Sequence, residues 1–311
     1  MGDVTVGHDA LAEEFSTHRS HLLGVAYRLT STLADAEDAV QESWLRLSTL
    51  DDHKRAEIRD LRAWLTTIVG RIALDKLRCA AFRRERYVGP WLPEPILTPL
   101  GTAPSEDPLE VVVRDDGVRM AAMVVLDRLS PEQRVAFVLH DAFSVPFAEI
   151  AELLGCTVDT ARQYASRARR AVADADPPPR VSLDEQRALV ERFLVALANG
   201  DLKEVVSLLH PDITLIGDAD GRARTARRVM HGQERIARFS LGLVRQYGLD
   251  RLAAGQFMLA NGDLAMVLPD VPGDEDHWDL ARRVQVLAVR DGRICGIYDI
   301  VNPDKLTRLP V

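Results

Sequence analysis

The sequence predicts a multidomain protein in which two all-α domains precede an α+β domain. Three observations support this fold class. Apolar residues recur at helical spacing from Leu11 to Tyr87 and again from Leu109 to Ala175. Beyond Ser182, alternating apolar runs fold about Asn-Gly and Asp-Gly pairs, which are strong signals for β-hairpins. Proline-rich stretches separate these blocks. The expected boundaries are an all-α domain at 1–87, a linker at 88–112, an all-α domain at 113–176, a linker at 177–181 and the α+β domain at 182–311.

Length and charge exclude several classes of protein. A chain of 311 residues can hold two or three domains that each bury a core. The net charge of −8 argues against a protein that coats nucleic acid, although a local basic patch still permits specific binding. The three cysteines show no metal-ligand spacing, so we expect no metal and no cofactor. We find no signal peptide and no membrane-spanning run, so we expect a cytoplasmic protein without a membrane partner.

The first domain, 1–87, contains a helix with an acidic face. Asp35 to Leu47 places Ala36, Val40 and Leu47 at helical spacing. The opposite face carries Asp35, Glu37, Asp38, Gln41 and Glu42. This face would repel DNA. It is either a solvated surface or a docking site for a basic protein partner, and the pattern leaves both interpretations open.

A second helix is predicted from Ile58 to Arg86, and its end is basic. The basic residues there are Lys76, Arg78, Arg83, Arg84 and Arg86. They are candidate DNA contacts, and they also complement the helix dipole. Tyr87, which follows, is a candidate for stacking on unpaired bases. The proline-rich segment 88–112 then ends the helix, and we expect it to be an extended linker.

The second domain, 113–176, contains a helix-turn-helix signal. The first helix begins at Phe147, and Gly155 can end it in a left-handed conformation. Thr157 can cap the next helix, in which small apolar residues face inward. The outward residues are Arg162, Gln163, Ser166, Arg167, Arg169 and Arg170. They suit phosphates and base edges in a major groove, whereas the alternative is an ordinary solvated helix.

The C-terminal block, 182–311, reads as two helices followed by an antiparallel sheet. The helices are predicted at 183–199 and 202–209, and the hairpins turn at Asn261-Gly262 and Asp291-Gly292. Candidate pocket groups are His210, Asp212, Asp218, Tyr247, Asp263, Trp278 and Asp299. No spacing fixes an acid–base pair, so we assign no catalytic residue. Asp299 is expected to cap a strand or to pair with an arginine such as Arg282.

Three segments resemble sigma factors of the extracytoplasmic-function type in the sigma-70 class. They are DAEDAVQESWLRL, LRAWLTTIVGRIALDKLRCAAFRRE and the run from Leu126 to Val172. The resemblance implies that 1–87 is region 2 and that 113–176 is region 4. It further implies that the acidic helix docks on the β′ clamp helices of core RNA polymerase. The helix ending in RRERY would engage the promoter −10 element, and the helix-turn-helix would read the −35 element and touch the β flap.

Two further motifs resemble signatures of a sigma subgroup with a fused SnoaL-like domain of the NTF2-like cone fold. One is Trp91, Leu92, Pro93, Glu94 and Pro95, and the other is Asn302, Pro303, Asp304, Lys305 and Leu306. Where the subgroup often has DGGGK, this chain has Asp218-Ala219-Asp220-Gly221-Arg222. The resemblance implies that 182–311 is a regulatory domain that contacts the sigma domains. A small-molecule ligand in its pocket is a further expectation.

The leading hypothesis is therefore an alternative sigma factor that is not an enzyme. It would bind core RNA polymerase and promoter DNA, and its C-terminal domain would modulate its activity. Two other hypotheses stay open. One is a ligand-sensing helix-turn-helix repressor or activator. The other is a SnoaL-like isomerase or hydrolase with a DNA-binding arm.

Overall fold

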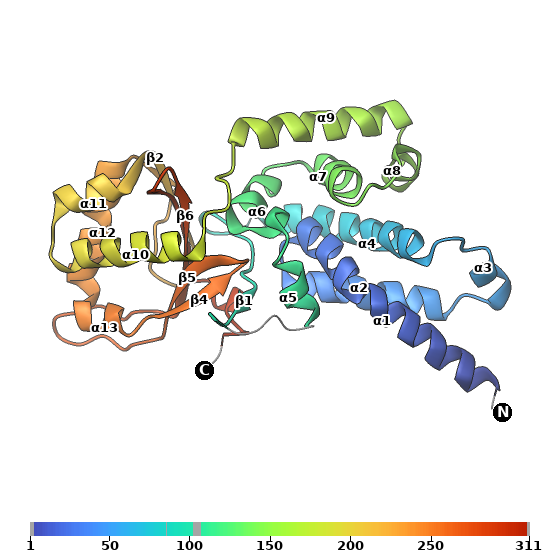
Figure 1. The fold of residues 1–311 in the computed structure, drawn as a ribbon, viewed down its shortest axis with the longest axis horizontal. Helices are drawn as coiled ribbons and strands as arrows, with labels where there is room; N and C mark the ends of the chain where they lie inside the picture. The colour runs from blue at the N-terminus through green and yellow to red at the C-terminus, as the bar shows by residue number, and fades with distance from the viewer. Residues whose placement is uncertain (1–2, 85, 102–106, 310–311) are drawn as a thin grey trace. The chain divides into compact units, whose positions relative to one another are not determined.

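The computed structural model describes residues 3–84, 86–101 and 107–309. The chain forms two compact units (Figure 1). The first contains Met1–Glu85, Pro104–Val118 and Ala122–Asp176. The second contains Arg86–Ala103, Arg119–Ala121 and Pro177–Val311. These boundaries differ from the expected ones, because most of the proline-rich segment and three residues near the start of the second helical domain belong with the C-terminal unit.

The first half of the first unit is helical, as expected. Its helices are α1 (Asp3–Thr30), α2 (Leu33–Ser48), α3 (Asp52–Ala56) and α4 (Leu61–Arg84). Thr32 precedes α2, and its side chain accepts a hydrogen bond from the backbone N–H of Asp35 and so caps the helix. The apolar stripe of α2 is buried, and α1, α2 and α4 pack on one another.

The second half of this unit contains the expected helix-turn-helix. Its elements are α5 (Pro108–Val112), η1 (Asp116–Val118), α6 (Met120–Leu126), α7 (Pro131–Phe137), η2 (Val138–Ala142), α8 (Phe147–Leu154) and α9 (Val158–Ala175). Gly155 ends α8 with a φ of 67°, in the left-handed region that favours glycine. Thr157 caps α9 through a hydrogen bond from the N–H of Thr160. Both turn predictions are confirmed.

Helix α4 packs closely against η2 and α8 at a glycine. A Cβ atom at Gly70 would lie 3.0 Å from Leu139 and 3.1 Å from Leu153. A larger residue would therefore force these neighbours to shift. The glycine is a weak helix former, and close packing explains its place inside α4.

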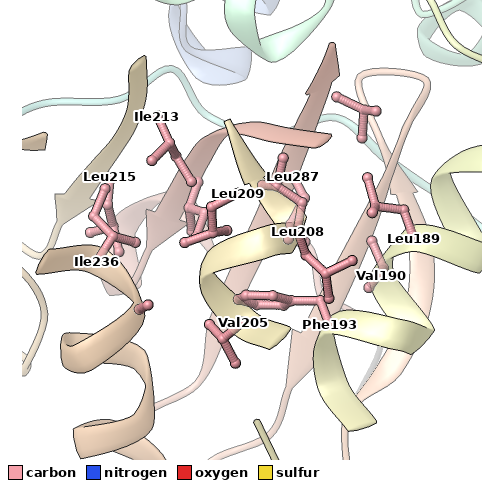
Figure 2. Close-up of a cluster of buried hydrophobic side chains, with 14 of the residues drawn as sticks. Leu189, Val190, Phe193, Val205, Leu208, Leu209, Ile213, Leu215, Ile236 and Leu287 are labelled. Atoms are coloured by element: carbon pink, nitrogen blue, oxygen red, sulfur yellow. The ribbon is translucent and has the colours of Figure 1, made fainter. Parts of the chain in front are cut away.

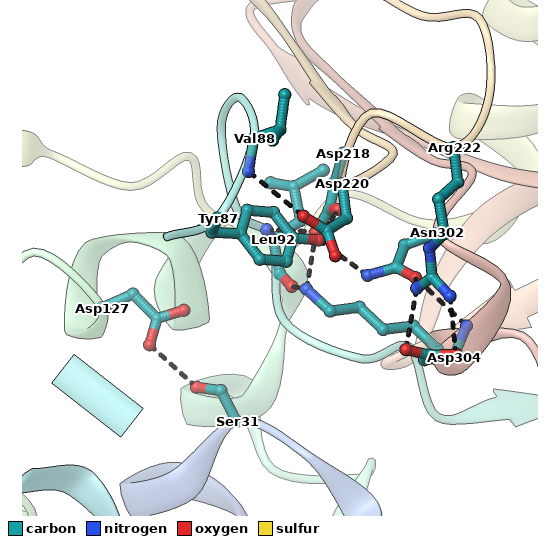
Figure 3. A network of polar contacts seen from close by, with 11 residues as sticks. Ser31, Tyr87, Val88, Leu92, Asp127, Asp218, Asp220, Arg222, Asn302 and Asp304 are labelled. Carbon is teal, nitrogen blue, oxygen red and sulfur yellow. Dashed lines mark hydrogen bonds and ion pairs between the residues drawn. The ribbon is translucent and has the colours of Figure 1, made fainter. Parts of the chain in front are cut away.

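A buried arginine joins α1 to the α6–α7 turn. Arg134 is only 1 % exposed. Its guanidinium donates to the backbone carbonyl of Arg28 at 2.7 Å, to the carboxylate of Asp127 and to the hydroxyl of Ser31. Ser31 also donates to Asp127, as Figure 3 shows. This charge is satisfied by partners from two distant parts of the sequence, as a buried charge must be.

His21 links α1 to α4 and to the segment after η2. One ring nitrogen lies 2.8 Å from the hydroxyl of Thr66, and the other lies 2.9 Å from a guanidinium nitrogen of Arg62. Its ring meets that of Phe143 edge-on at 5.1 Å. Burial, and then the positive charge of Arg62, lower the pKa of His21 to about 4.

We expect acid to destabilise the first unit through His21. The unfolded chain takes up a proton near pH 6.5, whereas the folded one resists until about pH 4, so stability is lost as pH falls through that window. Because the ring is only partly buried, we expect a loss of about 1–2 kcal/mol. Urea unfolding at pH 7 and pH 4.5 should show this loss in the native chain and a smaller one in His21→Gln. The exposed His53→Gln is the control, and equal losses in all three would contradict the assignment.

The second unit is a curved sheet with helices on one face. Its helices are α10 (Leu183–Ala198), α11 (Leu202–Leu208), α12 (Gln233–Tyr247), α13 (Leu249–Ala253) and η3 (Pro303–Lys305). Its strands are β1 (Leu97–Thr98), β2 (Leu209–Asp218), β3 (Met230–His231), β4 (Gln256–Ala260), β5 (Asp263–Leu268), β6 (Arg283–Arg290) and β7 (Arg293–Ile300). The strand order is β1-β4-β5-β6-β7-β2-β3.

Both predicted hairpins are present. Asn261 and Gly262 join β4 to β5, and Asp291 and Gly292 join β6 to β7, all four with positive φ. The sheet is antiparallel as expected except that β2 runs parallel to β7. Helices and other strands separate β2 from β7 in the chain, so no hairpin turn fixes their relative direction.

The core of this unit lies between the helices and the sheet. Figure 2 shows side chains of α10, α11 and α12 directed toward those of the strands, among them Phe193, Val205, Ile236 and Leu287. At about 25 cal/mol per Å² of buried apolar surface, each fully buried side chain of this size contributes roughly 1.5–3 kcal/mol. This cluster holds the sheet and the helices together.

The proline-rich segment adds the edge strand β1, which the sequence analysis did not predict. Leu97 and Thr98 pair with Ala260 and Leu259 of β4. A short edge strand tolerates flanking prolines, because one edge of its backbone needs no partner. Nearby, Arg119 donates from Nε to both carboxylate oxygens of Asp263, at 2.9 and 3.1 Å. Two chain segments from the N-terminal half are thus bound by the β4–β5 hairpin.

Candidate functional site

Helix α9 presents the basic row that the sequence predicted. Ala161, Ala165 and Ala168 are buried, so α9 sits close to α7. All six predicted DNA contacts are exposed, namely Arg162, Gln163, Ser166, Arg167, Arg169 and Arg170. They form one solvent-facing strip along the helix, which is the geometry of a recognition helix.

Two of these arginines already have acidic partners. Arg169 contacts Asp141 at 2.6 Å, and Arg162 contacts Asp159 at 3.0 Å. In the part of the chain that the structure describes, no ion pair holds Arg167. Its guanidinium is available to an outside anion without breaking an internal contact.

The basic end of α4 is engaged more than expected. Lys76 binds Asp35 at 3.1 Å and Asp38 at 3.2 Å, both on α2. Burial of Lys76 lowers its pKa, but the bonds to these carboxylates outweigh burial and raise it. Arg78 contacts Glu132 of α7 at 3.3 Å. Arg86 is exposed, and the side chains of Arg83 and Arg84 lie outside the described residues.

The acidic face of α2 borders a groove. Asp38 and Gln41 are exposed, while Asp35 accepts from the hydroxyl of Thr32 and Glu42 pairs with Arg46 at 2.5 Å. Glu37 and Gln41 line a hollow of about 510 Å³ between α1 and α2. Its other lining side chains are Ala12, Phe15, Ser16, Arg19, Val40 and Trp44. The hollow puts apolar surface beside carboxylates, a combination suited to a basic protein partner.

Asp218, at the end of β2, accepts hydrogen bonds from residues of both signature motifs. It is fully buried. One oxygen accepts from the backbone N–H of Leu92 at 2.7 Å and from the ammonium of Lys305 at 2.6 Å. The other accepts from the hydroxyl of Tyr87 (Figure 3). Burial and this bond raise the pKa of Tyr87 far above its usual value.

The rest of the second motif extends the same contacts. Asn302 donates to the oxygen of Tyr87 at 2.7 Å, and Arg222 forms a two-pronged pair with Asp304 at 2.7 and 3.0 Å. The Lys305 ammonium lies 3.7 Å from the centre of the Trp91 ring. We call this set the motif network, and its members are Tyr87, Trp91, Leu92, Asp218, Arg222, Asn302, Asp304 and Lys305. Tyr87, expected to stack on bases, is here a member of this network.

The candidate pocket groups separate into three sets, and His210 accepts a hydrogen bond from the backbone N–H of Asp212 at 3.2 Å. Asp218 and Asp263 bind other segments of the chain, and Asp212 is exposed. Tyr247, Trp278 and Asp299 gather at the wall of one cavity of about 250 Å³.

The arginine partner of Asp299 is Arg283, at 3.3 Å, and not Arg282, which instead contacts Asp270 at 3.5 Å. The strand period of two explains the correction. Arg283 shares the face of β6 that carries Gln285, which lies opposite Asp299 in the register. The register of the β6–β7 pair shifts by one residue at a bulge between Ala288 and Val289, so alternation counted from the Asp291-Gly292 turn would have indicated Arg282.

Within residues 3–84, 86–101 and 107–309, no group of three or more histidine, cysteine, aspartate or glutamate side chains is arranged to hold a metal ion. None of the helices in these ranges is long and apolar enough to cross a membrane.

Comparison with known proteins agrees with this arrangement. The chain matches the family model of sigma-70 region 2 at residues 15–83, that of sigma-70 region 4 at 119–172 and that of the SnoaL-like domain at 190–297. It is 52 % identical over 304 residues to the ECF RNA polymerase sigma factor SigJ of Mycobacterium tuberculosis, covering 96 % of this chain and 94 % of that protein. The chain belongs to the ECF RNA polymerase sigma factors. The resemblance drawn from the sequence is thereby confirmed.

Other relatives of this sigma factor point the same way. The probable ECF RNA polymerase sigma factor SigI of M. tuberculosis is 34 % identical, over 69 % of this chain and 71 % of its own length. The crystal structure of M. tuberculosis SigJ matches with a TM-score of 0.80 and 49 % identity, covering 96 % of this chain and 99 % of that one. The predicted fold class, two helical sigma domains followed by an α+β SnoaL-like domain, is confirmed.

Proposed function

We propose that this sigma factor acts in the cytoplasm, binds core RNA polymerase and directs it to promoters, with α4 at the −10 element and α9 at the −35 element. One observation supports this proposal most strongly. The segment that matches region 4 contains α9, a capped helix with an exposed strip of arginines. Region 2, with its acidic α2, supplies the surface for polymerase. The chain lends specificity and has no catalytic residue of its own.

Arg167 is the residue of α9 whose loss should matter most. It is exposed, it sits at the centre of the strip, and no ion pair among the described residues holds it. We expect Arg167→Ala to weaken binding to the upstream promoter element by about 5- to 150-fold, the range for one lost base contact. Binding to core polymerase should be unchanged.

Competition binding of holoenzyme to matched and scrambled −35 sequences measures this effect. Arg192→Ala, which removes an exposed arginine from α10, is the matched control. Equal affinity of the native chain and Arg167→Ala for the upstream element would remove Arg167 from the recognition surface.

The acidic face of α2 is the proposed polymerase surface. Asp38→Lys with Glu42→Lys reverses two charges on it, and we expect at least a tenfold loss of affinity for core polymerase. Because these residues do not face DNA in the proposal, the salt dependence of DNA binding should not change. Pull-down of core polymerase provides the measurement, and Glu57→Lys, on the exposed segment after α3, is the control. An unchanged pull-down would refute the assignment.

We further propose that the SnoaL-like unit regulates the sigma regions by an intramolecular contact. The motif network would transmit this regulation. The network binds Tyr87 and Leu92, in a segment that begins four residues after the end of the region 2 match at residue 83. Chains ending before Ser182 and before Asn302 should differ from the intact chain in transcription without unfolding the first unit. Identical activity of all three would leave the network without a regulatory role.

We propose that this unit binds a ligand without converting it. Both oxygens of Asp299 are occupied: Oδ2 accepts from Thr225 at 2.5 Å and from Arg283, and Oδ1 accepts from Gln285 at 3.2 Å. A carboxylate held in this way positions an arginine and has little freedom to act as a base.

A further inference from the structure

The helix-covered face of the sheet in the second unit encloses a cavity of about 400 Å³. This size lies within the range of small-molecule sites, about 300–1,000 Å³. Its walls come from α10, α12, α13 and the strands, and most of its lining is aliphatic. Val195 and Leu249 line it and are exposed, so apolar side chains lie where the cavity meets solvent.

The lining of this cavity also includes polar and charged side chains. Among them are Arg283, Gln285 and Tyr247. Arg283 and Tyr247, together with Leu243, also line the second cavity of about 250 Å³. The two cavities therefore share one wall. The larger, mostly apolar cavity lies on the α10 side of this wall, and the smaller, polar cavity lies on the side of the loop after β2.

Arg283 is 2 % exposed and its internal hydrogen bonds are long. It donates to Asp299, to the Arg224 carbonyl and to the Ala281 carbonyl at 3.3 Å each, and to the Tyr247 hydroxyl at 3.4 Å. Charge-assisted bonds of a guanidinium to a carboxylate normally measure about 2.7–2.9 Å. The guanidinium is held in position, and it can still form a shorter and stronger hydrogen bond with an acceptor on a ligand.

The second cavity, of about 250 Å³, carries an excess of positive charge. Its lining includes the guanidinium groups of Arg224, Arg227 and Arg283 against the single carboxylate of Asp299. The guanidinium carbon of Arg224 lies over the Trp278 ring, 4.2 Å from the ring centre. A neutral apolar ligand would leave this charge unused, whereas an anionic group would be attracted to it.

We propose that the SnoaL-like unit binds an amphipathic carboxylic acid. Its apolar body lies in the larger cavity between α10 and α12, and its carboxylate reaches Arg283 and the arginines beyond the shared wall. This inference deepens the proposed regulatory role by naming the ligand class. Ligand binding can be measured without polymerase. The ligand proposal and the proposed regulation of transcription can therefore be refuted independently.

Isothermal titration of the full chain with decanoate tests the proposal, with naphthylacetate as a second acid of flat, rigid shape and decanol as the neutral match. We expect one saturable site for at least one acid, roughly tenfold or more tighter than for decanol, which is the gain from a charge-assisted bond. The tighter of the two acids indicates the shape of the apolar body. Binding of decanol as tight as that of both acids, or no binding of either acid, would overturn the proposal.

Two pairs of variants locate the site. Ala253→Trp fills the mouth and should weaken acid binding about tenfold, whereas Ala188→Trp, exposed on α10 away from the cavity, should not. Arg224→Gln should weaken acid binding and leave decanol unaffected, whereas its neighbour Arg228→Gln, outside the cavity lining, should change neither. Circular dichroism checks that each variant folds. Unchanged binding in both Ala253→Trp and Arg224→Gln would place the acid elsewhere and overturn the assignment.

Discussion

Asp218→Ala is expected to destabilise the second unit by about 3–5 kcal/mol, the usual cost of removing one partner of a buried ion pair. The substitution leaves the Lys305 ammonium buried without its carboxylate, and it leaves the N–H of Leu92 without an acceptor. It also takes away the partner of the Tyr87 hydroxyl. Residues 86–101 should then separate more readily from the sheet.

Urea unfolding and hydrogen exchange of residues 86–101 measure the two consequences. Asp220→Ala is the matched control, because Asp220 is only partly buried and accepts one hydrogen bond, from the N–H of Val88 at 3.1 Å. We expect the control to cost about 1 kcal/mol. If both substitutions have the same small effect, the motif network does not hold the linker.

Arg134→Met is expected to have a comparable effect on the first unit. The replacement keeps an unbranched apolar stem but leaves the Asp127 carboxylate without its guanidinium partner, at a cost of about 3–5 kcal/mol. The carbonyl of Arg28 and the hydroxyl of Ser31 lose their donor as well.

The melting temperature of the first unit provides the measurement. Arg128→Met, at an exposed position after α6, is the control and should stay within about 0.5 kcal/mol of the native chain. A small effect of Arg134→Met would show that the network around Arg134 does not join α1 to the α6–α7 turn.

Local patterns in the sequence were sufficient for the helix-turn-helix and the hairpins. Gly155 and Thr157 mark the turn and the cap because each needs a particular backbone or side-chain chemistry at one position. Asn261-Gly262 and Asp291-Gly292 mark hairpins for the same reason. Such signals depend on neighbours in sequence, so one chain suffices to read them.

Long-range pairings could not be predicted in this way. The packing of Gly70 against Leu139 joins residues far apart in the chain, as does the pairing of Arg119 with Asp263. Lys76 was expected at DNA because its helix end is basic, and only the fold shows that Asp35 and Asp38 lie within reach of it. The resemblance to a sigma subgroup identified the two signature motifs, but the meeting of these motifs at Asp218 was not predicted.

Sequencing of transcript 5′ ends tests the central claim most directly. Core RNA polymerase is supplied with fragmented genomic DNA and either the intact chain or the chain ending before Ser182. We predict that at least one form directs initiation to a defined set of sites with shared −35 and −10 sequences, and that Arg167→Ala loses the −35 preference. Start sites indistinguishable from those of core polymerase alone, with both forms, would contradict the account.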